Sequence, residues 1–235
     1  MKALKAYLAL CRISNLPTVW TNVLAACLLS GERFTLAASL LLALALSCFY
    51  LAGMCLNDLC DVEHDRQSRS SRPIPSGRVS PQGARRLTLA LFAAGFLLLA
   101  AAPNPSGVAG AVLLLLAIVI YDFHHKRNPF SVLLMALCRM LVFVVAALAL
   151  SGRIDQPVLV AAGIQFVYVV TISLVARHEN TRSSPFPFPV IPAMIAGISL
   201  VDGIVMASLV SPPWLVAGMA GMLLTWVGQR YVRGD

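Results

Sequence analysis

The feature that most constrains this chain is a series of long apolar stretches that recur along its whole length. Each of the eight stretches has roughly 17 to 24 residues, about what an α-helix needs to cross the hydrocarbon core of a bilayer. Lipid offers the backbone no hydrogen-bond partners, and no stretch alternates like a barrel strand, so we expect helices. We therefore predict an all-α, polytopic membrane bundle of about eight transmembrane helices, one domain over residues 1–235, with spans near 14–30, 34–57, 84–102, 105–121, 130–150, 156–176, 188–210 and 213–231.

The distribution of charge fits a membrane topology better than a nucleic-acid surface. The net charge is +8, although only 12% of the residues are charged. With eight spans, only Arg33 and Arg153 among the 18 lysines and arginines fall on one side and Arg139 lies within a span, so the rest share the other side. The positive-inside rule then places both termini and the long charged loops in the cytosol. We expect an integral membrane protein that binds no nucleic acid.

The six cysteines and four histidines show neither paired nor metal-ligand spacing. Zinc sites and disulfide frameworks both depend on such spacing. We expect the cysteines to pack as small apolar residues and the histidines to lie in loops or at interfaces.

An acidic segment, residues 55–65, directly follows the second apolar stretch. If the helix continues, Asp58, Asp61 and Asp65 fall within an arc of roughly 60°, while Glu63 points to nearly the opposite side. Carboxylates so arranged repel one another unless a cation lies between them, and their hard oxygens suit Mg²⁺. We predict a Mg²⁺ site at Asp58, Asp61 and Asp65; the alternative is a solvated acidic loop neutralised by nearby arginines.

Basic and aromatic residues recur on the same predicted side of the membrane. Lys126 and Arg127 could hold the oxygens of a phosphate-bearing ligand, as arginine and lysine commonly do. Each could equally be an anchor that extends to the membrane surface, and Tyr121 could belong to an aromatic belt. Both interpretations remain open for these three residues.

Arg139 is the one basic residue inside a predicted span, roughly 13 Å deep at 1.5 Å per residue. An ionisable residue at such depth is costly and indicates a functional role by default. Arg139 could contact a substrate, a carboxylate or a backbone carbonyl, or pair with another helix, for example through Asp202. Asn22, also within a span, is either a substrate contact or a link between two helices.

The segment Asn57-Asp58-x-x-Asp61-x-x-x-Asp65 resembles the first aspartate-rich motif of the UbiA superfamily of intramembrane prenyltransferases. Residues 72–80, Arg-Pro-Ile-Pro-Ser-Gly-Arg-Val-Ser, are similar to that family's segment R-P-[IL]-x-x-G-x-[IV]-S. Further similarity lies in Arg12-x-x-Asn15-x-Pro17 through Asn22 and in residues 121–127, so it covers roughly the first 140 residues.

The resemblance implies a Mg²⁺-dependent enzyme that transfers a prenyl group from a polyprenyl diphosphate to an aromatic or lipid acceptor within the membrane. Mg²⁺ and the basic side chains would stabilise the charge that develops as the C–O bond breaks, in an apolar cavity that excludes water. The expected catalytic residues are the three aspartates and Lys126. The expected substrate-binding residues are Asn22, Asn57, Arg72, Tyr121, Arg127, Arg139 and Arg177.

The chain departs from the family pattern after the sixth span. Where the family usually carries a second aspartate-rich motif, this chain has Arg177-His178-Glu179-Asn180. Glu179 could hold a second Mg²⁺ with water and phosphate, or it could be a surface glutamate while Arg177 and Arg182 bind phosphate. This segment and the apparent lack of a ninth span resemble a short bacterial branch of the superfamily, the EboC-like proteins.

Two other functions compete with prenyl transfer. Alcohol phosphotransfer to phospholipids is typically marked by D-x-x-D-G-x-x-A-R, whereas Val62, Glu63 and His64 follow Asp61 here. A non-catalytic carrier or flippase for an isoprenoid or other lipid is favoured by the depleted second motif. The sequence leaves the acceptor, the prenyl length, the oligomeric state and protein partners open.

Overall fold

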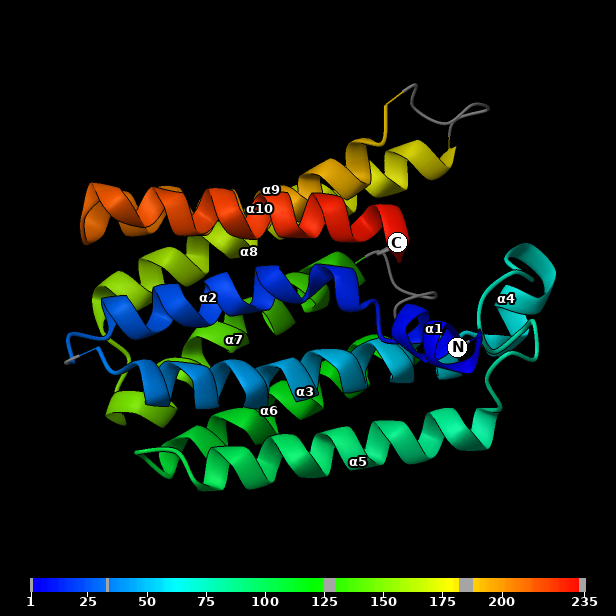
Figure 1. Cartoon of the computed structure of the whole chain (residues 1–235), viewed down its shortest axis with the longest axis horizontal. Helices are drawn as coiled ribbons and strands as arrows, with labels where there is room; N and C mark the ends of the chain where they lie inside the picture. Colours follow the sequence, from blue (N-terminus) through cyan, green and yellow to red (C-terminus); the bar gives the residue numbers. More distant parts are fainter. Residues whose placement is uncertain (1, 33, 125–129, 182–187, 233–235) are drawn as a thin grey trace.

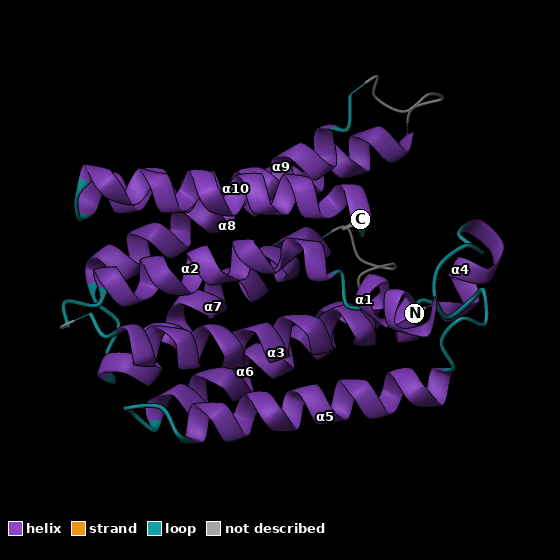
Figure 2. Cartoon of the chain, in the orientation of Figure 1, coloured by secondary structure: helices purple, strands orange, loops and turns teal. Residues whose placement is uncertain are grey.

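The computed structural model describes residues 2–32, 34–124, 130–181 and 188–232. Every regular element in these ranges is a helix (Figure 2). Eight helices correspond one for one to the eight predicted apolar stretches, which confirms the predicted fold class. They are α2 (Leu16–Leu29), α3 (Leu36–Cys60), α5 (Pro81–Ala100), α6 (Ser106–His124), α7 (Ser131–Ser151), α8 (Gln156–Thr181), α9 (Val190–Leu209) and α10 (Leu215–Tyr231).

Six of these helices, α3 and α5 to α9, are long and apolar enough to cross a membrane. Helix α2, with the preceding 3-10 turn η1 (Ile13–Asn15), forms a shorter apolar helix. Helix α10 has 17 residues and runs beside α9 (Figure 1). Six candidate spans and two shorter helices in one bundle agree roughly with the predicted count of eight. The chain is an integral membrane protein.

Two additional helices lie at one end of the bundle. Figure 1 shows α1 (Lys2–Leu10) and α4 (Val62–Ser68) together there, where α3 ends and α5 begins. Ala6 and Leu10 of α1 are buried in a small apolar cluster with Ile74 and Val79 from the segment between α4 and α5. The third short element, η2 (Pro212–Trp214), precedes α10. The end that carries α1 and α4 is referred to below as the acidic end.

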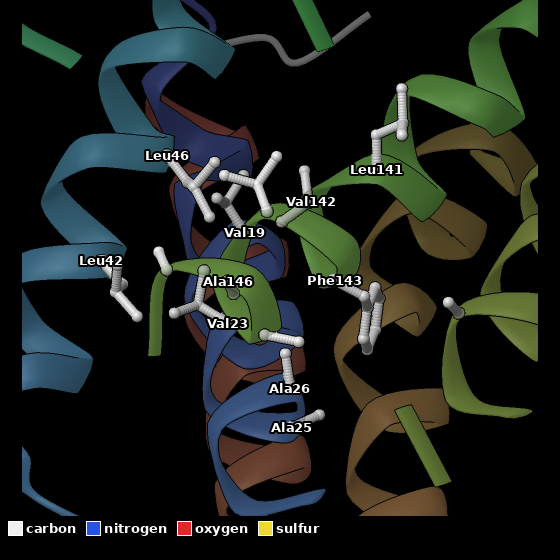
Figure 3. Close-up of a cluster of buried hydrophobic side chains, with 14 of the residues drawn as sticks. Val19, Val23, Ala25, Ala26, Leu42, Leu46, Leu141, Val142, Phe143 and Ala146 are labelled. Atoms are coloured by element: carbon white, nitrogen blue, oxygen red, sulfur yellow. The ribbon is translucent and has the colours of Figure 1, made fainter. Parts of the chain in front are cut away.

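The main core lies between α2, α3 and α7. Figure 3 shows Val19 and Val23 of α2 beside Leu46 of α3 and Ala146 of α7. Phe143 of α7 is fully buried in the same cluster. Dense packing of small and branched side chains holds these helices together, because lipid supplies little hydrophobic driving force between helices. Of these three closely packed helices, α2 and α3 carry the segments that form the acidic end.

Helices α9 and α10 approach each other closely at a pair of glycines. A Cβ atom added to Gly203 would lie 2.7 Å from the Cα of Gly218, which is closer than real Cβ contacts. Small residues at such crossings let two membrane helices bring their backbones into contact. This contact ties α10 to the bundle even though α10 is shorter than the candidate spans.

Candidate active site

The acidic motif spans the junction between α3 and α4. The hydrogen bonds Asp61 N to Asn57 O (3.0 Å) and Asp65 N to Asp61 O (2.9 Å) continue the helical pattern across it. Asp58, Asp61 and Asp65 are buried, with 4%, 7% and 2% of their surface exposed, whereas Glu63 is exposed. Three carboxylates therefore lie inside the protein at the acidic end, and Glu63 lies outside, as the predicted helical arc requires.

Two arginines from different segments pair with these aspartates. Nη1 of Arg72 lies 2.7 Å from Oδ2 of Asp65 and 3.4 Å from Oδ1 of Asp58. Nη2 of Arg12 lies 3.3 Å from the same Asp58 oxygen. Both arginine side chains are largely buried, with 14% and 15% exposed. The structure thus places positive charge, also buried, directly against two of the three carboxylates.

The segment between α4 and α5 positions Arg72 by folding back on itself. Val79 N donates to Pro73 O at 3.0 Å, and Ile74 and Val79 bury their side chains against α1. Gly77 has φ of 74°, in the left-handed region that glycine adopts without a steric penalty. The compact turn explains why a segment rich in proline and glycine delivers a buried arginine to the aspartates.

Arg12 was part of the sequence resemblance but not one of the predicted site residues. It lies between α1 and η1 with φ and ψ both 47°, the one non-glycine residue with positive φ among those that the structure describes. A left-handed non-glycine residue costs on the order of 1–3 kcal/mol and persists where surrounding contacts enforce it. Its ion pair with Asp58 is such a contact. The motif Arg12-x-x-Asn15 was the only signal in the sequence that pointed to Arg12 as a site residue.

Asp122 is a buried carboxylate that the sequence prediction missed. It is 4% exposed, near the end of α6, and its Oδ1 accepts a hydrogen bond from Nδ2 of Asn57 at 3.1 Å. Tyr121, the neighbouring residue that was predicted to bind substrate, is partly buried. The structure therefore brings Asn57 of the acidic motif together with α6, through a residue of the similar segment 121–127 that was not among the predicted site residues.

A second polar cluster lies deeper in the bundle. Nη1 of Arg139 donates to Oδ1 of Asn22 at 2.9 Å, and Nδ2 of Asn22 donates to Oδ2 of Asp202 at 2.7 Å. Thr21 and Gln165 also donate to Asp202, at 2.6 and 2.7 Å. The Asn22 amide thus links Arg139 to Asp202, accepting a hydrogen bond from the arginine and donating one to the aspartate.

The guanidinium of Arg139 also lies 5.9 Å from the centre of the Tyr50 ring, within range of a cation–π contact. Tyr50 precedes Asp58 by eight residues in α3, which is about 12 Å at 1.5 Å per residue. Arg139 therefore contacts a residue of α3 that precedes Asp58 by about two helical turns along the chain.

The remaining predicted residues are less closely tied to the cluster. Nη2 of Arg177 donates to the Ser131 hydroxyl at 3.0 Å, which links α8 to the start of α7. Glu179, also in α8, is partly buried. Lys126, Arg127 and Arg182 lie outside the described residues, so their predicted contacts with phosphate stay predictions.

The described part of the chain contains no group of three His, Cys, Asp or Glu side chains close enough to hold one metal ion. The aspartates nevertheless offer the oxygen donors that Mg²⁺ prefers, and all three are buried. Arg72, which contacts both Asp58 and Asp65, occupies the place of a cation between them. The donor chemistry of the cluster therefore fits Mg²⁺, and the roles of Asp58, Asp61, Asp65 and Glu179 as ligands stay predictions.

All six cysteines are free, and one pair adjoins the acidic cluster. The Sγ atoms of Cys11 and Cys55 lie 3.5 Å apart. The hydrogen bond from the Cys55 thiol lowers the pKa of Cys11, outweighing burial and the nearby charge of Asp58, which raise it. The pair fills the space between α3 and the turn that carries Arg12.

With the geometry established, comparison with known proteins settles the family. Residues 16–232 match the UbiA prenyltransferase family, which is nearly the whole chain. The chain belongs to this family. The family resemblance inferred from the aspartate-rich motif is therefore confirmed, while the assignment to the EboC-like branch stays a prediction.

Named relatives are similar over parts of the chain. The digeranylgeranylglyceryl phosphate synthase of Ignicoccus hospitalis is 42% identical over 121 residues, 51% of this chain and 38% of the relative. The polyprenyl transferase ausN of Penicillium brasilianum is 30% identical over 179 residues, 75% of this chain and 46% of the relative. The matched part of this chain thus spans less than half the length of either relative.

Solved structures share the fold. A structure described as a study of digeranylgeranylglyceryl phosphate synthase in membranes has a TM-score of 0.66 at 19% identity and covers 98% of this chain and 88% of its own. A UbiA homologue from Archaeoglobus fulgidus, bound to DMAPP and Mg²⁺, has a TM-score of 0.63 at 17% identity and covers 93% and 86%. These similarities establish the UbiA fold for the chain.

Proposed function

We propose that this UbiA-family protein is a prenyltransferase that moves a prenyl group from a polyprenyl diphosphate to an acceptor within the membrane, with Mg²⁺ bound at the aspartates. The observation that carries the proposal is the burial of Asp58, Asp61 and Asp65 at one end of a membrane bundle. Three carboxylates are costly to bury unless cations compensate them. A Mg²⁺-bound diphosphate would bring both the cation and a ligand for the neighbouring arginines.

Each group in the cluster then has a task. Asp58, Asp61 and Asp65 hold Mg²⁺, which would neutralise the diphosphate and stabilise the charge that develops as it leaves. Arg72 and Arg12, released from their carboxylates, can donate to phosphate oxygens, a role also proposed for Lys126 and Arg127. The C–O bond of the prenyl diphosphate breaks with its electron pair on the departing pyrophosphate. The acceptor forms the new bond to the prenyl carbon and loses a proton.

The bundle supports this chemistry by excluding water from the prenyl cation. The main core includes apolar side chains of α2, α3 and α7, together with others from the neighbouring helices. Arg139, which contacts Tyr50 of α3 and Asn22 of α2, is a basic group for an acceptor that reaches the prenyl carbon from within the bundle. The names of the archaeal relatives suggest a glyceryl phosphate lipid as one acceptor class to be tested with this protein. Glu179 remains a candidate ligand for a second Mg²⁺.

We also propose that the acidic end faces the cytosol of a bacterium. Lysines and arginines are concentrated in the segments at this end, as the positive-inside rule requires of cytosolic loops. This orientation would give the site access to a soluble diphosphate headgroup and let lipid accommodate the prenyl tail.

The proposal is tested by incubating purified protein with radiolabelled DMAPP, GPP and longer polyprenyl diphosphates, Mg²⁺, and aromatic and glyceryl phosphate acceptors. We expect a labelled product and Mg²⁺-dependent pyrophosphate release, both lost in Asp58→Ala and Asp61→Ala. Glu63→Gln, at an exposed carboxylate outside the cluster, is the matched control and should retain both activities. Unimpaired turnover in the two aspartate variants would overturn the site assignment.

A non-catalytic lipid carrier is the second candidate. It is favoured by the single carboxylate, Glu179, at the place where the family usually has two or more. A carrier would move labelled isoprenoid lipid between the leaflets of vesicles and release no pyrophosphate. Lipid movement without pyrophosphate release, for every diphosphate and acceptor tried, would favour the carrier over the enzyme.

A further inference from the structure

Asp122 is the buried carboxylate near the acidic cluster that has no assigned role. It comes from α6, whereas Asp58 lies in α3, Asp65 in α4 and Asp61 at the junction between those two helices. Its Oδ1 accepts a hydrogen bond from Nδ2 of Asn57, and both residues are buried, with 4% and 8% exposed. Burying a carboxylate is costly, so its placement beside the amide of the acidic motif calls for an explanation.

The hydrogen bond determines which way the Asn57 amide faces. An asparagine side chain has a donating NH₂ and an accepting oxygen, which are similar in shape and can exchange places by rotation. An ionised carboxylate only accepts, so it selects the orientation in which Nδ2 faces α6. The Oδ1 atom of Asn57 is then directed away from Asp122.

Asn57 is well placed for that orientation to matter. It immediately precedes Asp58, and its backbone oxygen accepts from Asp61 N at 3.0 Å, so it lies one helical turn before Asp61. Residues four apart share a helix face, so Asn57 and Asp61 lie on the same side of the helix. On that side a rotated amide would offer NH₂ hydrogens, which repel a cation, whereas the fixed amide can offer a neutral oxygen, the kind of atom that Mg²⁺ accepts.

We infer that Asp122 is a positioning residue that acts through Asn57, fixing the amide so that its oxygen supports the binding of a Mg²⁺-diphosphate at the aspartate cluster. The inference rests on the proposed function. Partners that orient the ligands of a metal typically change metal affinity by roughly 10- to 100-fold when they are removed. We expect removal of Asp122 to weaken Mg²⁺ binding within the same range and to leave folding intact.

The test measures ligand binding without turnover. Purified full-length protein receives geranyl thiolodiphosphate, a poorly reactive analogue, at fixed concentration, and the rise in melting temperature is followed as Mg²⁺ is titrated. For Asp122→Ala we expect the half-saturating Mg²⁺ concentration to rise by roughly 10-fold or more. Asp122→Asn, whose side chain can accept from Asn57 but can also donate to a rotated amide, should fall between Asp122→Ala and wild type. Glu63→Gln, the exposed control, should match wild type.

A double-variant cycle separates this role from a structural one. If Asp122 acts through Asn57, Asp122→Ala should add nothing to the Mg²⁺ demand of Asn57→Ala. Should Asp122→Ala fail to fold, Asp122→Leu replaces the carboxylate with a side chain of similar size and serves instead. An unchanged Mg²⁺ midpoint in these variants, or equal loss in the Ala and Asn variants, would overturn the inference alone. Lack of Mg²⁺-dependent stabilisation in wild type would overturn the proposed function and the inference together.

Discussion

Removing Arg72 should expose how strongly the acidic cluster depends on compensating charge. In Arg72→Ala, Asp65 loses a partner at 2.7 Å and Asp58 loses one of its two arginines. The carboxylates are 3% and 5% exposed, so water cannot replace the lost partner. Breaking a buried ion pair from one side costs about 3–5 kcal/mol. At about 2–4 °C per kcal/mol for a chain of this size, the melting temperature should fall by roughly 6–20 °C.

The assay is thermal unfolding in detergent micelles, with Arg66→Ala as the matched control. Arg66 pairs with Glu63 at 3.0 Å, a similar distance, but the two side chains are 58% and 81% exposed. Exposed pairs contribute about 0–1 kcal/mol, so this variant should shift the melting temperature by less than about 4 °C. Mg²⁺ with a non-reactive prenyl diphosphate should recover part of the Arg72→Ala loss. Equal shifts in the two variants would refute the reasoning.

Three further predictions follow from other parts of the bundle. Asp202→Ala removes the acceptor of three buried hydrogen bonds. At about 0.6 kcal/mol each in a membrane interior, the free energy of unfolding, measured by reversible unfolding, should fall by about 2 kcal/mol. A decrease below about 0.5 kcal/mol would contradict the network. Gly203→Ala should destabilise the protein, because the added Cβ would meet Gly218. Gly163→Ala, with open space around it, should be neutral or stabilising by up to about 1 kcal/mol. An equal loss of stability in the two variants would count against the close helix contact. In oriented vesicles, an impermeant maleimide should label single cysteines at Ser70 and Gln156 from opposite sides, with the unsubstituted protein as background; labelling from one side would disprove the topology.

The sequence predicted the helices because hydrophobic length is decisive in a bilayer. Each of the eight apolar stretches was expected to be a helix, because backbone groups in lipid must form their hydrogen bonds within the segment. The sequence did not reveal α1, because a nine-residue helix at the end of the bundle has no such length requirement. It also placed Asp58, Asp61 and Asp65 on one face correctly, since local helix geometry determines that arrangement.

Contacts between distant segments could not be predicted in the same way. The ion pairs of Arg72 depend on how residues 69–80 fold back, and Arg12 reaches Asp58 through a backbone conformation that its sequence does not favour. Asp122 reaches Asn57 because α6 happens to end beside α3, which no spacing within either helix reveals. The proposed pairing of Arg139 with Asp202 identified the right helices but missed Asn22 between them.

The central claim, that the three aspartates bind a metal-diphosphate, is tested most directly by an experimental structure with Mg²⁺ and a poorly reactive prenyl thiolodiphosphate. The account predicts metal density bonded to oxygens of Asp58, Asp61 or Asp65, with the diphosphate on the metal and the Arg72 ion pairs broken or rearranged. A diphosphate bound elsewhere, with Arg72 still paired to Asp58 and Asp65 and no metal at the cluster, would contradict it.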